Sequence, residues 1–223
     1  VDPNDIPAIA IVDAELMYSL PKGTTAATGM DALTHAIEGY ITKAAWELSD
    51  MFEIEAIRLI NKYLRQAVYD PKNPAGRSGM ALAQYVAGMA FSNVGLGVVH
   101  GMAHPMGSLF DIPHGVANAL LLPTIMEYNK PVCIDKYVEI AKAMDAYKEG
   151  MTKAEAAQAA CDAVRALAIE VGIPQHLSDL GITAKDIDAL ADQAIEDVCT
   201  PGNPRLVTRH SGNIVSQVSV CGT

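Results

Sequence analysis

From about residue 25 to residue 199, the sequence places apolar side chains at helical spacing almost without interruption. This pattern predicts amphipathic helices that bury one face against each other. Hydrophobic residues make up 50% of the chain, but aromatic residues only 5%. Because sheets draw on aromatic and β-branched residues, this profile favours a mainly α fold, a packed helical bundle.

Turn and capping signals divide the stretch into separate helices. Thr152-Lys-Ala-Glu155 is a capping box that starts one of them. We expect Pro105 to kink or break its helix, because proline removes a backbone donor. The expected helices span about residues 25–42, 50–69, 76–93, 99–110, 114–123 or beyond, 131–145, 152–171 and 183–199.

One short segment departs from the helical pattern. Residues 8–13, AIAIVD, follow Pro7 and are rich in apolar residues, which is typical of a buried strand in a parallel sheet. A lone strand leaves its backbone groups without partners, and no second convincing strand precedes the last fifteen residues. Either the partner strands lie outside this chain, or the strand assignment is wrong.

Charge and cysteine usage narrow the class of protein. The formal net charge is −10, and no basic cluster exceeds two residues, which argues against nucleic-acid binding. No apolar run reaches the ~18 residues that a membrane span needs. The cysteines are widely spaced, which predicts reduced thiols in a cytoplasmic protein. They are Cys133, Cys161, Cys199 and Cys221.

Histidines and one aspartate form the most informative pattern in the sequence. Asp31 and His35 are four residues apart, so a helix places them on one face. His100 and His104 repeat this spacing, and His114 follows a proline at an expected helix start. Small residues surround these positions and allow helices to approach closely. The pattern predicts a metal site in which ligands project inward from facing helices.

Each of these side chains also has an ordinary interpretation. A single buried histidine is more often a hydrogen-bonded core residue than a ligand, and Asp–His pairs at this spacing occur as ion pairs. If they bind a metal together, imidazoles plus a carboxylate suit Fe(II), Zn(II), Mn(II) or Co(II) and argue against Ca²⁺ and Mg²⁺. Five candidate ligands exceed what an open site needs, so one histidine is left for proton chemistry.

Two segments carry a family resemblance. DALTHAIEGYIT (31–42) and FSNVGLGVVHGMAHPMGSLFDIPHGVAN (91–118) resemble the signature regions of iron-containing alcohol dehydrogenases. The resemblance covers roughly residues 1–208 and is greatest to the lactaldehyde reductase (propanediol oxidoreductase) branch. It implies the C-terminal portion of the dehydroquinate synthase-like fold of that family, a helical metal-binding domain with one leftover N-terminal strand.

The resemblance also assigns roles to residues. By this likeness the metal ligands are Asp31, His35, His100 and His114, and His104 lies beside the nicotinamide and substrate as a catalytic and cofactor-binding residue. The implied activity is interconversion of a small alcohol or diol, such as 1,2-propanediol, and its aldehyde. The implied cofactors are Fe(II), or Zn(II) in some members, and NAD(P). Full-length relatives are expected to be homodimers.

The resemblance suggests a division of the chain into three parts. Residues 1–22 correspond to the end of an α/β nucleotide-binding domain, residues 23–208 to the helical metal-binding domain, and residues 209–223 to an atypical tail. The family's Gly-rich nucleotide loop has no counterpart in this sequence. We therefore expect the isolated chain to bind metal but to turn over little or no substrate.

Two other functions remain open from the sequence. One is a catalytically inactive, truncated metal-binding helical module, which would use the same ligands without nicotinamide. The other is a metallohydrolase-like bundle whose metal activates water. The second is disfavoured because no carboxylate near His100 or His114 in sequence stands out as its base.

Overall fold

The computed structural model describes residues 7–208. Within that range all regular secondary structure is helical. The α-helices are α1 (Lys22–Ile41), α2 (Glu47–Tyr69), α3 (Pro74–Val94), α4 (Val98–Phe110), α5 (His114–Asn129), α6 (Ile134–Ala143), α7 (Lys153–Glu170) and α8 (Ile187–Glu196). Short 3₁₀ turns lie before, between and after them: η2 (Ala14–Met17), η3 (Lys130–Val132), η4 (Leu177–Leu180) and η5 (Thr200–Gly202). The predicted mainly α fold is confirmed.

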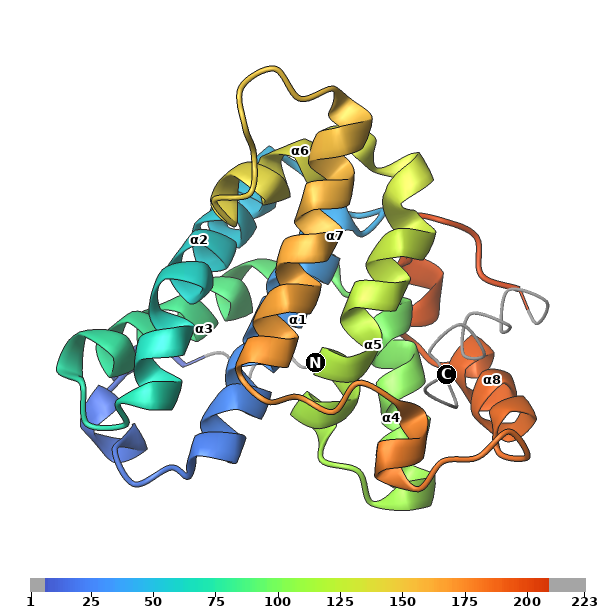
Figure 1. The fold of residues 1–223 in the computed structure, drawn as a ribbon, viewed down its shortest axis with the longest axis horizontal. Coiled ribbons are helices and arrows are strands. Elements are labelled where there is room, and N and C mark those ends of the chain that lie inside the picture. Colours follow the sequence, from blue (N-terminus) through green and yellow to red (C-terminus); the bar gives the residue numbers. More distant parts are fainter. Residues whose placement is uncertain (1–6, 209–223) are drawn as a thin grey trace.

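Helix α1 is the centre of the bundle. It packs against α2 and α3 on one side and against α5 on the other. Figure 1 shows α2 and α3 at the left, with α4, α5 and α8 at the right. Helix α4 packs against both α5 and α8, so α5 links α1 to the helices on that side of the bundle.

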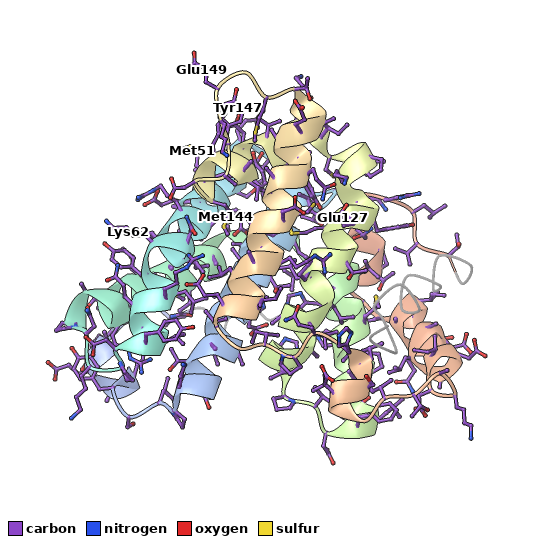
Figure 2. The ribbon with its side chains drawn as sticks, viewed as in Figure 1. Met51, Lys62, Glu127, Met144, Tyr147 and Glu149 are labelled. Atoms are coloured by element: carbon purple, nitrogen blue, oxygen red, sulfur yellow. The ribbon has the colours of Figure 1, made fainter. Side chains whose placement is uncertain are left out.

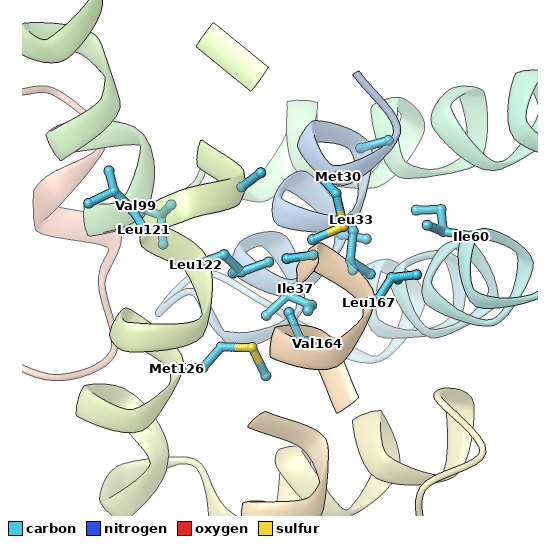
Figure 3. Close-up of a cluster of buried hydrophobic side chains, with 14 of the residues drawn as sticks. Met30, Leu33, Ile37, Ile60, Val99, Leu121, Leu122, Met126, Val164 and Leu167 are labelled. Carbon is cyan, nitrogen blue, oxygen red and sulfur yellow. The ribbon is translucent and has the colours of Figure 1, made fainter. Parts of the chain in front are cut away.

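Apolar side chains from several helices fill the space around α1. Met30, Leu33 and Ile37 are fully buried on one face of α1. Figure 3 shows them beside Leu122 of α5 and Leu167 of α7. Burial of a Leu, Ile or Met side chain contributes about 1.5–3 kcal/mol. This apolar packing therefore fixes the position of α1, and with it the position of the polar side chains that α1 carries.

Most charged side chains lie on the outer face. Figure 2 shows Lys62 and Glu149 pointing away from the bundle, and both are exposed. Among the described residues, no single helix is long and apolar enough to cross a membrane. Within residues 7–208, one pair of helices, α3 and α4, is long and apolar enough when the two are taken together, but the pair is bent by 103° at its junction.

The predicted strand at residues 8–13 is wrong for this structure. The segment has no regular secondary structure, and Ile9 and Ile11 are 81% and 90% exposed. A strand needs hydrogen-bond partners on a neighbouring strand, and residues 7–208 supply none. The apolar pattern of this segment was therefore not sufficient to predict its conformation.

Pro105 was expected to kink or break its helix, and of these two outcomes the break does not occur. Helix α4 runs from Val98 to Phe110 with Pro105 inside it. Proline crowds the carbonyl of the residue four positions earlier, which is Gly101 here.

The capping box at Thr152 and Glu155 is confirmed, and so is the helix start at His114. The proposed tail, residues 209–223, lies outside the described residues, and the domain boundaries stay predictions.

Candidate metal centre

Three helices bring the four predicted ligands together. Asp31 and His35 lie on α1, His100 on α4 and His114 on α5. Each offers one ligand atom, and these four atoms all lie within 4.8 Å of one another. Residues from distant parts of the sequence thus form one compact cluster of three imidazoles and a carboxylate.

Glycine at the start of α5 allows this convergence. A Cβ on Gly115 would lie 2.6 Å from the carbonyl oxygen of Ala27 and 3.3 Å from Cβ of Asp31. Both distances are shorter than comfortable van der Waals contact, and the first involves rigid backbone. Only glycine therefore lets α5 approach α1 closely enough to place His114 beside Asp31.

Hydrogen bonds fix which nitrogen of two histidines faces the cluster. Nδ1 of His35 lies 2.8 Å from the carbonyl oxygen of Asp31, which can only accept. Nδ1 of His100 lies 2.7 Å from a carboxylate oxygen of Glu38. Both Nδ1 atoms therefore donate, and the two Nε2 atoms face each other 3.1 Å apart. Two acceptor nitrogens at this distance are suited to share a cation.

Glu38 is a buried carboxylate that holds the start of α4. It accepts backbone N–H bonds from Gly97, Val99 and His100 at 2.7–3.2 Å, besides the bond from the His100 ring. Helix N-termini favour negative charge, so this position suits an ionised carboxylate. The same group thus anchors the helix and orients its ligand, as partners of metal-bound histidines commonly do.

Asn118 performs a similar task for the other two ligands. Its Nδ2 donates to Oδ1 of Asp31 at 2.6 Å and lies 3.0 Å from Nε2 of His114. Asn118 is fully buried, and its Oδ1 has no partner among the described residues. His114, a candidate ligand, and Asn118, whose amide positions the Asp31 carboxylate, thus lie one turn apart on α5.

Burial lowers the pKa of two of the imidazoles. For His35, loss of solvent is the largest cause, and His100 adds to it, while Asp31 opposes it. For His114, burial is again the largest cause, opposed by Asp31. Metal ions bind the neutral imidazole, so this environment favours the ligand form of both rings.

His104 stands at the edge of the cluster. It lies one turn after His100 on α4, and its Nδ1 is 2.7 Å from Oδ2 of Asp197. Its ring stacks on His114 with centroids 5.5 Å apart. The side chain is 42% exposed, whereas that of His100 is only 2% exposed. His104 is therefore placed for contact with both the cluster and solvent.

A cleft opens beside Asp31 and His35. Its volume is about 440 Å³, and apolar side chains from η2, α1 and α3 form most of its wall. Phe91 lies in this wall, with its ring 4.4 Å from that of His35. The cleft thus brings an apolar surface next to two of the predicted ligands.

The residues that orient the ligands were not predicted from the sequence. Glu38 follows His35 by three residues and Asn118 follows His114 by four, so helical spacing alone could have nominated both. Asp197 is 93 residues from His104, and nothing local in the sequence connects them.

Comparison with known proteins identifies the family. Residues 25–216 match the profile of the "Fe-containing alcohol dehydrogenase family, C-terminal". The chain is 56% identical over 208 residues to lactaldehyde reductase of Escherichia coli K12, and 47% identical over 202 residues to 1,3-propanediol dehydrogenase of Citrobacter freundii. The chain belongs to the iron-containing alcohol dehydrogenase family.

A solved structure supports the same fold. The crystal structure of a 1,3-propanediol oxidoreductase superposes with a TM-score of 0.94 at 44% identity, covering 96% of this chain and 56% of that one. The matches cover 93% of this chain but 54% of lactaldehyde reductase, and 91% but 52% of 1,3-propanediol dehydrogenase. The chain therefore spans about half the length of the curated relatives it matches.

Proposed function

We propose that this chain supplies the metal centre of an alcohol dehydrogenase that interconverts a small alcohol or diol and its aldehyde with NAD(P). The observation that carries the proposal is the convergence of Asp31, His35, His100 and His114 within 4.8 Å. Membership of the iron-containing alcohol dehydrogenase family adds to it.

The donor set fits Fe(II), with Zn(II) as the alternative. Three imidazole nitrogens and one carboxylate oxygen are borderline donors of the kind that both ions take. Nε2 of His35 and Nε2 of His100 face each other as acceptors, an arrangement that a shared cation would stabilise. When bound, such a cation acts as a Lewis acid on an alcohol or carbonyl oxygen, and nicotinamide carries the hydride.

His104 is the candidate for moving the hydroxyl proton. The Asp197 carboxylate accepts from its Nδ1 at 2.7 Å, which leaves Nε2 of a neutral ring without a proton. That nitrogen can take a proton from a substrate hydroxyl and pass it to solvent through the exposed side of the ring. The family resemblance also makes His104 the candidate for contact with the nicotinamide.

The substrate class follows from the relatives and from the cleft. The relatives are named for lactaldehyde, 1,3-propanediol and, in Bacillus methanolicus at 41% identity, methanol. The cleft beside Asp31 and His35 is lined mainly by apolar side chains, which suits the carbon skeleton of a short alcohol. We propose lactaldehyde and 1,2-propanediol as the first pair to test.

The metal assignment is tested by elemental analysis. The purified chain is loaded with Fe(II) or Zn(II), dialysed, and compared with His100→Ala and with His176→Ala, a histidine outside the cluster. With Fe(II) we expect one bound ion per chain in the wild type and the control, and with either metal His100→Ala should bind one ion fewer per chain than the wild type. Unchanged metal content in His100→Ala would contradict the assignment.

The activity is tested separately. NADH oxidation with lactaldehyde is followed for the chain alone and for the chain joined to the N-terminal part of the E. coli relative, with His104→Ala in parallel. We expect turnover in the joined protein and a decrease of about 10²–10⁴-fold in His104→Ala. Metal binding without turnover in the joined protein would favour the inactive metal-binding module.

Assembly is a further part of the proposal. We propose that the complete protein is a homodimer, as the family resemblance implies. Light scattering of the purified protein gives its mass in solution, and a monomer at micromolar concentration would contradict this.

A further inference from the structure

A second group of metal-binding side chains lies beside the first. It consists of His104, Asp197 and Cys199, whose ligand atoms all lie within 4.8 Å of one another. None of the three is among the four residues of the candidate metal centre. Stacking of the His104 ring on His114 makes the two clusters neighbours.

Packing of α8 against α4 brings this group together. Gly101 faces the turn that follows α8, and a Cβ there would meet Oγ1 of Thr200 and lie 3.3 Å from the carbonyl oxygen of Ala194. Thr200 in turn donates to that carbonyl at 2.5 Å. The close contact holds the segment that carries Asp197 and Cys199 against the helix that carries His104.

Asp197 is held on both sides. Its Oδ2 lies 2.7 Å from Nδ1 of His104, and its Oδ1 accepts the backbone N–H of Cys199 at 2.8 Å. The carboxylate is only 14% exposed. Bonds of about 2.0–2.1 Å to nitrogen and oxygen put two ligands of one tetrahedral cation roughly 3.3 Å apart. His104 and Asp197, at 2.7 Å, therefore need to separate by about 0.6 Å to share one ion.

The donors of this group differ from those of the first cluster. They are one imidazole nitrogen, one carboxylate oxygen and one thiol sulfur, and thiolate favours softer cations. Burial, followed by the charge of Asp197, raises the pKa of the Cys199 thiol to about 12. A bound divalent cation reverses this effect, because a coordinating thiol is deprotonated outright.

We propose that His104, Asp197 and Cys199 form a second metal site, which takes a thiophilic divalent cation such as Zn²⁺ or Cd²⁺. Three protein ligands leave a fourth position for water, as in open zinc sites. Ions reach the group from solvent, because the His104 side chain is 42% exposed. The thiolate distinguishes this site from the cluster of Asp31 and its three histidines.

Occupation of this site has a consequence that rests on the proposed function. A cation bound to His104 and Asp197 takes the imidazole away from proton transfer. Excess Zn²⁺ therefore inhibits hydride transfer while leaving the first cluster loaded. The binding experiment below does not depend on this consequence, so it separates the second site from the activity.

The test is a titration of the metal-free chain with Cd²⁺, followed by the ultraviolet charge-transfer absorption of cadmium–thiolate bonds and by equilibrium dialysis. We expect the wild type to bind two equivalents, one of which produces the thiolate band. Cys199→Ser should lose the band and one equivalent. His100→Ala should keep the band while losing the other equivalent.

Matched variants identify the sulfur. Cys221→Ser removes a cysteine outside the described residues and should leave the band intact. Asp197→Asn should weaken the thiolate-linked equivalent by at least about tenfold, while circular dichroism verifies the fold. A thiolate band that survives in Cys199→Ser, or a wild type without one, would overturn the second site.

Discussion

The carboxylate of Glu38 lies 2.7 Å from Nδ1 of His100, and side-chain exposure is only 1% and 2%. The same carboxylate accepts three backbone N–H groups at the start of α4. Glu38 therefore both anchors the start of α4 and orients His100, the candidate ligand that α4 carries. A change at Glu38 should affect stability and metal binding together.

Glu38→Gln replaces one acceptor oxygen by a donor that faces N–H groups. We expect metal affinity to fall about 10- to 100-fold, because the His100 ring loses its partner. We also expect a loss of about 2–3 kcal/mol in the free energy of unfolding. Equilibrium dialysis and urea unfolding measure the two effects. Glu47→Gln, at an exposed position on α2, serves as the control and should change neither.

Whether a contact in this site can be predicted from the sequence depends on how far apart its two residues lie along the chain. Asp31 and His35 are neighbours on a helix by spacing alone, and His114 at a helix start follows from the proline before it. These features led to a metal-site hypothesis, and the structure brings the predicted side chains together. Whether they bind a metal stays a prediction.

The partners of these residues were harder to predict. Asp197 reaches His104 only because α8 packs on α4, which is a tertiary contact with no local signal. The segment at residues 8–13 failed for a related reason, because a strand is defined by its partners and not by its own apolar pattern. Helices satisfy their backbone internally, so their existence was the most predictable part of the fold.

Gly115 and Gly88 provide a matched test of helix approach. Gly115→Ala would put a methyl group 2.6 Å from the Ala27 carbonyl and push α5 away from α1. We expect a loss of about 1–3 kcal/mol in stability and weaker metal binding. Gly88, inside α3, has no atom within 4 Å of an added Cβ. Gly88→Ala should instead gain about 0.5–1 kcal/mol. Equal effects of the two changes would contradict the role of Gly115.

Glu53 should make stability depend on pH. Both of its carboxylate oxygens are buried without a partner among the described residues. Burial, followed by the charge of Asp50, raises its pKa from 4.5 to about 9. Between these values the folded state binds a proton that the unfolded state has released. Stability contributed by the protonated form is therefore complete below about pH 4.5 and declines as the pH rises toward about 9.

Glu53→Gln removes this titration. We expect its free energy of unfolding to exceed that of the wild type by on the order of 1–3 kcal/mol near pH 8, and by much less near pH 5. Urea unfolding at both pH values measures the difference. Glu47→Gln on the same helix should keep the wild-type slope. A variant whose stability tracks the wild type at every pH would show that Glu53 does not titrate as described.

Arg77 links the start of α1 to two other segments. Its guanidinium is fully buried and donates to the carbonyl of Pro71 at 2.8 Å, to Oγ1 of Thr25 at 2.9 Å and to the carbonyl of Leu20 at 3.3 Å. The planar group has donors on three nitrogens, whereas a lysine ammonium has them on one. Arg77→Lys therefore leaves at least one of these three acceptors without its partner.

We expect Arg77→Lys to lower the free energy of unfolding by about 2–3 kcal/mol. Arg65→Lys is the matched control, because Arg65 pairs with Glu170 at the surface and such pairs contribute less than about 1 kcal/mol. Thermal unfolding of both variants measures the difference. Metal content should stay at the wild-type level in both, since neither residue contacts the four candidate ligands. If Arg77→Lys were as stable as Arg65→Lys, the three hydrogen bonds of the Arg77 guanidinium would not be what holds the start of α1 in place.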